Sequence, residues 1–79
     1  MVENSYQMCT RITSISECEF AASFLGLSDT IAVDDGQSYM SYDPPYCYYE
    51  YSELKYNSDG SNYGSCGSDA CLCKGMYVT

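Results

Sequence analysis

The sequence predicts a small disulfide-rich α+β domain, with one helix over residues 14–25 packed on a small antiparallel β-sheet. Three observations lead to this prediction: a length of 79 residues, six cysteines, and one clear helical pattern followed by short aromatic segments. A chain of this length buries only about 60% of the surface that its unfolded form exposes, so its core alone is marginal. Disulfides usually supply the missing stability, so we expect residues 1–79 to form a single stapled module.

The helix is predicted from signals at both of its ends. Two overlapping capping boxes begin at Ser14 and Ser16, and the second would add a contact between Ile15 and Phe20. Gly26 suits the left-handed residue of a Schellman stop. The spacing of apolar residues predicts a buried stripe of Cys18, Ala21, Ala22 and Leu25, widened by Phe20 and Phe24.

Short extended segments are predicted on both sides of the helix. They are residues 6–12, 30–33, 39–42, 46–51, 54–57 and 70–74, with 76–79 as a tail that extends the last one. The segment 46–51 has the strongest signal, because its aromatic residues suit a pleated surface. Ser52-Glu53 is expected to be the hairpin turn that follows it, and residues 57–69 are rich enough in turn formers to be a loop.

The six cysteines indicate disulfides, and therefore an oxidising compartment such as the extracellular space or an organelle lumen. They are Cys9, Cys18, Cys47, Cys66, Cys71 and Cys73. Many pairings are possible, but Cys71 and Cys73 are too close in sequence to bond to each other comfortably. We predict Cys47–Cys66, with Cys9 and Cys18 bonded to Cys71 and Cys73 in either order. Zinc is a minor alternative, because the spacing lacks paired knuckles and the chain has no histidine.

The net charge of −8 excludes several classes of partner. Nucleic acids and anionic lipid surfaces require clustered basic residues, whereas Arg11, Lys55 and Lys74 are isolated. No apolar run approaches the roughly 20 residues that span a bilayer, so membrane insertion is not expected. Residues 1–5 lack the pattern of a signal peptide, so we expect either a processed mature form or a domain excised from a longer chain.

Four segments together resemble a known type of module. Residues 9–30 contain C-x2-I-T-S-x3-C-E-x-A-A-x2-L-G-L-S-D-T, and they are followed by D-P-P-x-C-Y-Y at 43–49, L-K-Y-N at 54–57 and C-L-C-K at 71–74. This combination resembles a small cysteine-rich module of secreted or surface proteins of unicellular algae and related protists. Tyr46 stands where such modules more often have glycine, and Ile15-Ser16 replaces a more acidic helix start. The resemblance implies an extracellular or lumenal module and no catalytic activity.

No constellation of catalytic or metal-binding residues is evident in the sequence. Without histidine, acid–base catalysis would depend on carboxylates, and Glu50 and Glu53 flank a predicted turn where we expect them to be solvated. Residues 34–36 and 57–62 supply oxygen atoms near glycines, as calcium loops do, but neither segment has EF-hand spacing. We therefore interpret both segments as ordinary turns, and we expect no cofactor and no metal.

Tyrosines are concentrated in the middle of the chain and are the strongest indication of function. They are Tyr39, Tyr42, Tyr46, Tyr48, Tyr49, Tyr51, Tyr56 and Tyr63. Some must build the core of a domain that lacks tryptophan, but a two-faced strand over 46–51 would leave others exposed. Tyrosine combines a large rigid contact area with a polar tip, which suits binding surfaces. The candidate binding residues are Tyr46, Tyr48, Glu50, Tyr39 and Tyr42.

These observations favour a non-enzymatic protein-interaction or structural module of a larger extracellular or lumenal assembly. The alternative is a carbohydrate-binding module that uses an exposed tyrosine face, with or without calcium. A secreted inhibitor or toxin is a third possibility for any small cysteine-rich framework.

Overall fold

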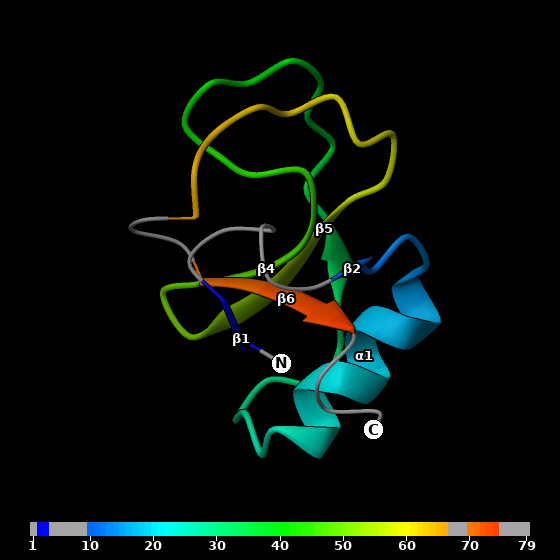
Figure 1. Cartoon of the computed structure of the whole chain (residues 1–79). Helices are drawn as coiled ribbons and strands as arrows, with labels where there is room; N and C mark the ends of the chain where they lie inside the picture. Colours follow the sequence, from blue (N-terminus) through cyan, green and yellow to red (C-terminus); the bar gives the residue numbers. More distant parts are fainter. Residues whose placement is uncertain (1, 4–9, 67–69, 75–79) are drawn as a thin grey trace.

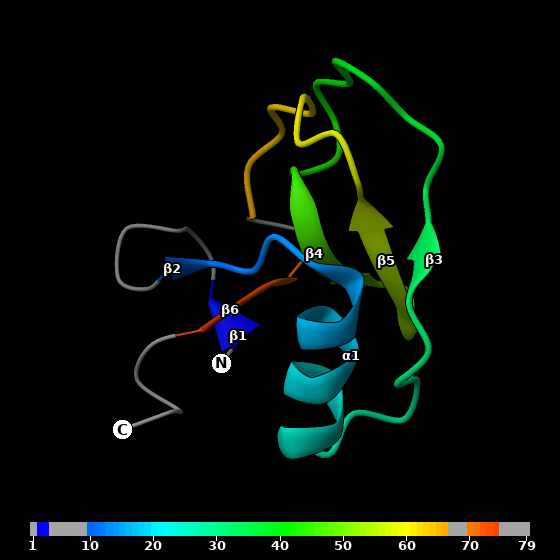
Figure 2. The ribbon, with the colours of Figure 1, turned by 90° about the vertical axis from the view of Figure 1, so that its right-hand side faces the viewer.

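The computed structural model describes residues 2–3, 10–66 and 70–74. Its elements are α1 (Ile15–Phe24), β1 (Val2–Glu3), β2 (Thr10–Arg11), β3 (Val33–Asp34), β4 (Tyr46–Glu50), β5 (Glu53–Asn57) and β6 (Ala70–Lys74). The strand order is β1-β6-β4-β5-β3, and β2 also pairs with β6 (Figure 1). The predicted α+β class is therefore confirmed. The sheet is mixed rather than wholly antiparallel, because β3 runs parallel to β5 (Figure 2).

The helix begins at the first of the two predicted capping boxes. The Ser14 hydroxyl accepts a hydrogen bond from the Glu17 backbone N–H at 3.2 Å, which satisfies one of the unpaired donors of the first turn. Because Ser14 is the cap, Ile15 lies inside the helix and is largely exposed. The second capping box, with its contact between Ile15 and Phe20, is therefore not the one that begins the helix.

The helix ends in the predicted Schellman motif. Gly26 has a φ of +75°, a left-handed conformation that glycine adopts without steric cost. The Leu27 N–H donates to the Ala22 carbonyl at 3.0 Å, and the Gly26 N–H donates to the Ser23 carbonyl at 3.1 Å. These bonds satisfy carbonyls that the last turn would otherwise leave unpaired.

The helix faces the sheet with small side chains. Cys18, Ala21 and Ala22 are buried, and Leu25 packs at their margin, as the predicted stripe requires. The expectation that Phe20 and Phe24 widen this stripe is wrong: they are 59% and 58% exposed, and their rings stack 6.4 Å apart. Alanine and cysteine allow the helix to lie close to β5 and β6 (Figure 2), which leaves no room for phenylalanine at the contact.

The remaining core comes from the sheet and its neighbouring loops. The buried cluster contains Ile12, Cys18, Ala21, Ala22, Ala32, Cys47, Leu54, Tyr56 and Leu72. A carboxylate closes one edge of it, because Glu19 accepts a hydrogen bond from the Ala32 N–H at 2.9 Å. This bond fixes the segment that leads into β3 against the side of α1.

The β4–β5 hairpin forms as predicted, but its turn lies one residue earlier. Glu50 and Glu53 are opposite each other, so Tyr51-Ser52, rather than Ser52-Glu53, makes the connection. Both turn residues have positive φ, +51° and +63°, which is the signature of a type I′ turn. Such turns match the twist of the two strands, but they favour Asn-Gly because other residues are strained in this conformation.

Relieving this strain should stabilise the protein. We expect the double variant Tyr51→Asn/Ser52→Gly to raise the free energy of unfolding by about 1–2 kcal/mol, since asparagine and glycine adopt positive φ more readily. Urea denaturation followed by tyrosine fluorescence measures the shift of the midpoint. Ser52→Ala is the control, because alanine changes the side chain without relieving the strain. An unchanged midpoint in the double variant would contradict this interpretation of the turn.

The other extended segments agree with the predictions only in part. The segment predicted over 30–33 is observed as β3, Val33–Asp34, and β6 has the predicted bounds. Residues 39–42 are not a strand, because Tyr39 has a φ of +59° and breaks the extended path. Of the segment predicted over 6–12, the structure describes only the end, which contains β2; the tail at 76–79 lies outside the described residues.

The disulfides connect different partners from those predicted. Cys18 bonds to Cys47 and joins α1 to β4, and Cys66 bonds to Cys71 and joins the loop after β5 to β6. The prediction of Cys47–Cys66 is wrong, as is the assignment of Cys18 to Cys71 or Cys73. The physical reason is that the small-residue face of α1 lies over the face of β4 that carries Cys47. Cys73 is also disulfide-bonded, and Cys9 lies outside the described residues.

Candidate functional site

Two loops lie side by side beyond one end of the β4–β5 hairpin, at the top of Figure 1. We call residues 36–43 and 58–64 the tyrosine loops. Hydrogen bonds join their backbones: the Tyr63 N–H donates to the Met40 carbonyl, and the Gly64 N–H donates to the Asp43 carbonyl, both at 2.9 Å. Ser38 adds a side-chain bond to Asp59 at 2.6 Å. The two loops therefore form one surface rather than two independent segments.

Three exposed tyrosines lie on this surface. Tyr39, Tyr42 and Tyr63 are 75%, 65% and 68% exposed. Tyr39 and Tyr42 are among the residues predicted to bind, whereas Tyr63 is not. Its position in Asn62-Tyr63-Gly64, inside a predicted loop, is the signal that could have identified it. Tyrosine, serine, glycine and asparagine dominate these loops, as they do in antibody binding loops, where tyrosine offers a large contact area at low entropic cost.

The predicted centre of the binding surface is wrong, because Tyr48 is fully buried. Its hydroxyl donates a hydrogen bond to Asp35 at 2.7 Å. Burial, followed by this hydrogen bond to Asp35, raises the pKa of the Tyr48 phenol far above its ordinary value, so the hydroxyl stays protonated. Alternation along the strand suggested an exposed Tyr48, because it does not show that Asp35, in the segment after β3, reaches the Tyr48 hydroxyl.

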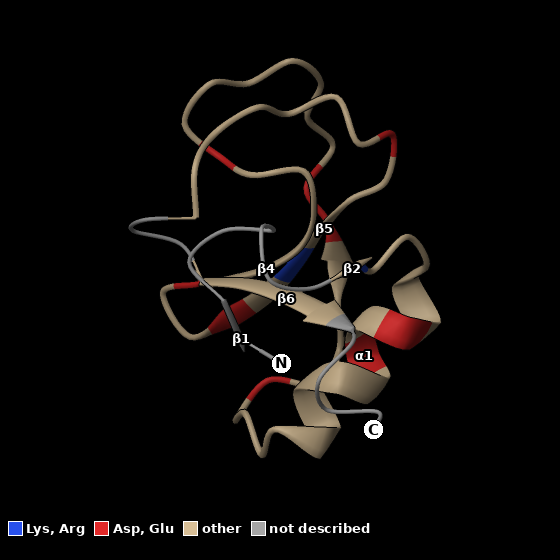
Figure 3. Cartoon of the chain, viewed as in Figure 1, with Lys and Arg blue, Asp and Glu red and all other residues tan. Residues whose placement is uncertain are grey.

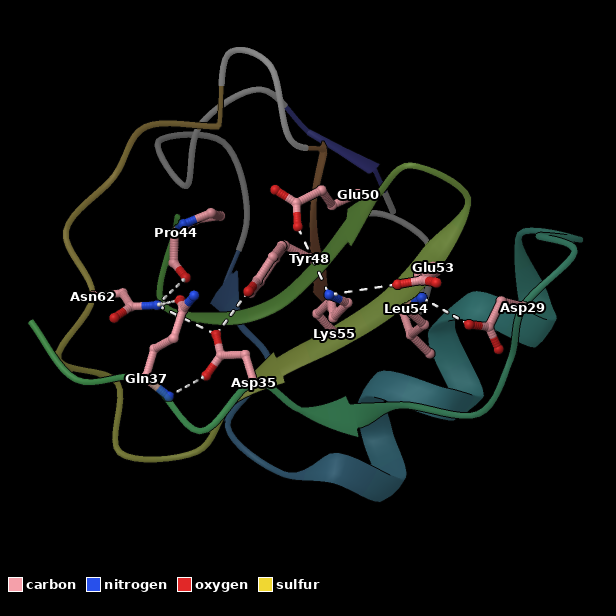
Figure 4. Close-up of polar contacts among 10 residues, drawn as sticks. All are labelled: Asp29, Asp35, Gln37, Pro44, Tyr48, Glu50, Glu53, Leu54, Lys55 and Asn62. Atoms are coloured by element: carbon pink, nitrogen blue, oxygen red, sulfur yellow. Dashed lines mark hydrogen bonds and ion pairs between the residues drawn. The ribbon is translucent and has the colours of Figure 1, made fainter. Parts of the chain in front are cut away.

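Tyr46 and Glu50, the other two predicted binding residues, do not join the exposed tyrosines. Tyr46 is half-buried, with the Arg11 guanidinium 5.8 Å from its ring centroid and the Tyr56 ring 6.4 Å away. Glu50 lies at the opposite end of β4, within 3.8 Å of the Lys55 ammonium group (Figure 4). The structure therefore brings together Tyr39 and Tyr42 with Tyr63, and it places Tyr46, Tyr48 and Glu50 elsewhere.

A buried network of polar side chains supports the tyrosine loops. We call Asp35, Gln37, Asn57 and Asn62 the polar hub. The Asn57 amide donates to Asp35 Oδ1 at 3.1 Å and to the Gln37 carbonyl at 2.8 Å, while its oxygen accepts from the Asn62 N–H at 3.1 Å. Asn57 and Asn62 are almost completely buried. A buried network with its partners satisfied rigidifies the segments it connects.

The hub also links the two loops directly to each other and to β4. The Asn62 amide donates to Gln37 Oε1 at 3.0 Å and to Asp35 Oδ2 at 3.3 Å (Figure 4). The Asn62 oxygen accepts from the Met40 N–H at 3.0 Å. Asp35 receives the Tyr48 hydroxyl as well. The loop geometry is therefore set by side chains from the same two turn-forming segments that the sequence analysis considered as calcium loops.

The oxygen atoms of these two segments accept hydrogen bonds from other groups of the protein. In residues 2–3, 10–66 and 70–74, no group of three or more acidic, cysteine or histidine side chains is arranged to hold a metal ion. Asp35 accepts from Tyr48, Asn57 and Asn62, so its carboxylate is occupied by donors. The arrangement therefore has a structural role, which is to hold the loops together by hydrogen bonds.

Two glycines allow the second tyrosine loop to pack closely. A Cβ atom on Gly64 would lie 2.7 Å from the backbone of Asp43, where no side chain fits. A Cβ atom on Gly60, which has a φ of +67°, would lie 2.3 Å from the Tyr46 ring. The loop therefore rests directly on its neighbours, and only its outward side chains reach solvent.

The charge on this surface is negative. The segments that form it contain no lysine or arginine, and Figure 3 shows only acidic positions there. The Ser38 and Ser61 hydroxyls, followed by the Ser61 N–H, hold the pKa of Asp59 below its ordinary 3.8. The Gly36 N–H, followed by the Ser58 hydroxyl, does the same for Asp34. Both carboxylates are therefore ionised at neutral pH.

Acid should loosen the tyrosine loops. The folded pKa of Asp59 is below its unfolded value, so the stabilisation is present above about pH 4 and is lost as the pH falls through the folded pKa. We expect the protection factors of the Tyr63 and Gly64 amides, which compare their exchange rates with the intrinsic rates at the same pH, to fall in this acidic range. NMR hydrogen exchange measures them, and Asp59→Asn is the control, because its protection factors should depend less on pH. Equal pH dependence in the two proteins would contradict the assignment to Asp59.

No helix in the described part of the chain has the length and apolar character needed to cross a membrane. The disulfides fit a secreted protein or one in another oxidising compartment. No family model matches the chain, and no curated protein or solved structure is significantly similar to it.

Proposed function

We propose that the protein is a non-enzymatic module that binds a protein partner through its tyrosine loops, within a larger extracellular or lumenal assembly. The observation that carries this proposal is the presence of Tyr39, Tyr42 and Tyr63 as exposed side chains on two loops that are already joined by hydrogen bonds. Tyrosine is among the residues most enriched at energetically important positions of protein interfaces.

Pre-organisation supports the proposal. Binding loses free energy when it has to order loops and side chains, and a surface that is already fixed avoids much of this loss. The polar hub fixes the tyrosine loops from below, and the Cys66–Cys71 disulfide anchors the chain just after the second loop. Fully exposed aromatic side chains on such a rigid base contribute little to folding, so their contribution to a binding surface is the better explanation of their presence.

Charge indicates the character of the partner. The chain has a net charge of −8, and the ionised Asp34 and Asp59 lie exposed beside the loops. A partner with a basic contact surface would be attracted by this field, and one with an acidic surface would be repelled. We therefore expect the rate of association to fall as salt is added, because salt screens charges that remain exposed to solvent.

A glycan is the second candidate ligand. Tyrosine rings stack on sugar faces, and the Ser38–Asp59–Ser61 cluster places hydroxyl and carboxylate oxygens beside the exposed rings. The same surface thus offers both the aromatic rings and the hydrogen-bonding oxygens that a sugar would contact. The two candidates are distinguished by which ligand, a protein or a glycan, loses binding when the tyrosine loops are changed.

The test compares the triple variant Tyr39→Ala/Tyr42→Ala/Tyr63→Ala with Phe20→Ala, which alters an exposed aromatic residue on α1, outside the tyrosine loops. The native protein is used to isolate partners from its source, and the affinity of the identified partner is then measured by surface plasmon resonance. We expect the triple variant to weaken binding at least about thirtyfold, as loss of one strong interface residue would do. Phe20→Ala should bind with wild-type affinity.

Two outcomes would contradict the proposal. One is a partner that binds the triple variant as tightly as the wild type. The other is binding on a glycan array that disappears in the triple variant, which would select the sugar-binding alternative. Tyr48→Ala is not informative here, because Tyr48 is buried and its loss would disturb the fold.

A further inference from the structure

Tyr51 is the most exposed large hydrophobic side chain of the described residues, at 93%, and no contact within the fold accounts for its presence. It lies at the tip of the β4–β5 hairpin, at the end opposite the tyrosine loops. Its φ of +51° is unfavourable for a side chain of this size, and asparagine would suit the turn better. A strained, solvent-exposed aromatic residue indicates a role outside the fold.

The surroundings of Tyr51 are acidic. Glu50 and Glu53 flank the turn and face each other across the hairpin. The Lys55 ammonium group lies 3.8 Å from Glu50 and 3.5 Å from Glu53, and Asp29 accepts a hydrogen bond from the Leu54 N–H at 2.9 Å (Figure 4). Two carboxylates, those of Glu50 and Glu53, therefore lie against one ammonium group, and the tip keeps a net negative charge.

We propose that Tyr51 is a site of tyrosine O-sulfation. In this reaction the phenolic oxygen attacks the sulfur atom of a phosphosulfate anhydride, a new O–S bond forms, and the S–O bond to the donor phosphate breaks. The phenolic proton passes to a base of the transferase, the nucleotide phosphate leaves, and no atom changes oxidation state. An enzyme that holds an anionic donor needs a basic cleft, and acidic residues beside the acceptor tyrosine dock in that cleft by charge complementarity.

The other exposed tyrosines have no exposed acidic residue directly beside them in the sequence. Tyr39 lies between Ser38 and Met40, and Tyr63 lies between Asn62 and Gly64. Tyr42 precedes Asp43, but that aspartate is buried. Tyr51 alone among these four exposed tyrosines combines an accessible phenol with acidic residues on both sides. The disulfides fit an oxidising compartment such as the secretory pathway, where the transferase would have to meet the chain.

Sulfation would give the hairpin tip a permanent negative charge and three further hydrogen-bond acceptors. The modified tip would then be a second site for a basic partner, separate from the tyrosine loops. The inference depends on the oxidising compartment and not on what the tyrosine loops bind. The two proposals can therefore fail independently.

The experiment expresses the full chain for secretion from eukaryotic cells, with and without chlorate, which blocks synthesis of the phosphosulfate donor. Intact mass and peptide mapping then measure the modification. We expect a mass increase of one sulfuryl group, located at Tyr51, absent with chlorate and absent in Tyr51→Phe. Glu53→Gln should lower the modified fraction, and Tyr63→Phe should leave it unchanged. Tyr51→Phe should fold normally because the ring is exposed, and its disulfide content is checked by mass before and after reduction.

Three results would overturn the proposal. The first is a secreted wild-type protein without the added mass. The second is an added mass that persists in chlorate, which would identify phosphorylation instead. The third is modification of Tyr39, Tyr42 or Tyr63 to the same extent as Tyr51, which would show that the acidic hairpin tip confers no selectivity.

Discussion

Removal of the Cys18–Cys47 disulfide is expected to lower the free energy of unfolding by about 3.5 kcal/mol, the loop-entropy value for a closed loop of this size. The two cysteines are 29 residues apart and fully buried, and they join α1 to β4 across the core. The variant is Cys18→Ala/Cys47→Ala, since alanine adds no buried polar group. Guanidinium denaturation, with the remaining disulfides verified by mass, measures the loss.

The matched control is Cys66→Ala/Cys71→Ala. These residues are only 5 apart in sequence, so the same loop-entropy relation gives a loss of about 2 kcal/mol. A domain of this size has little stability to spare, so the first variant should be close to unfolding at room temperature. If the two variants lose equal stability, the Cys18–Cys47 bond does not act mainly by restricting the unfolded chain.

Asn57→Asp is expected to destabilise the protein by about 3 kcal/mol, although the two side chains have almost the same shape. The Asn57 amide donates to Asp35 and to the Gln37 carbonyl. Aspartate would replace this donor with an oxygen, remove both bonds, and place two carboxylates together inside the polar hub. Urea denaturation measures the stability, and the chemical shifts of the Tyr39 and Tyr63 amides report on the tyrosine loops.

Tyr48→Phe is the milder comparison for the same network. It removes one hydroxyl that donates to Asp35 and keeps the buried ring, so we expect a loss of about 1–1.5 kcal/mol. The tyrosine loops should shift more in Asn57→Asp than in Tyr48→Phe, because the Asn57 side chain bonds to both loops and the Tyr48 hydroxyl bonds to Asp35. An Asn57→Asp variant with the same free energy of unfolding as the wild type would contradict the central role of the polar hub.

Local signals predicted the local parts of this fold. The Ser14 cap and the Gly26 stop depend on residues within a few positions of each other, and both helix ends agree with prediction. The β4–β5 hairpin was also predicted, but its register was wrong by one residue at the turn. Tyr51-Ser52 lacks the Asn-Gly signature that would have located a type I′ turn.

Long-range packing explains what the sequence did not reveal. Periodicity counts Phe20 as apolar but does not show that α1 lies too close to the sheet to admit it. The partner of Cys18 depends on which strand passes below the helix. Alternation along β4 suggested that one face would be open, but Tyr48 is buried and its hydroxyl bonds to Asp35.

The candidate site shows the same division. Tyr39 and Tyr42 were recognised from composition, and the structure places them on an exposed surface. The polar hub was not recognised, because Asn57 and Asn62 are ordinary turn residues until the chain brings them beside Asp35. Whether a turn former ends a strand or supports a binding surface is decided by residues that are distant in sequence.

The separation between the polar hub and the exposed tips has a consequence for evolution and engineering. Asn57 and Asn62, which hold the loops, are buried, whereas positions 39, 42 and 63 are exposed to solvent. Substitution at these three positions should therefore change specificity with little effect on stability, provided that residue 39 tolerates its positive φ. Such a chain is suited to diversification: a library randomised at three positions would sample new ligands on one constant framework.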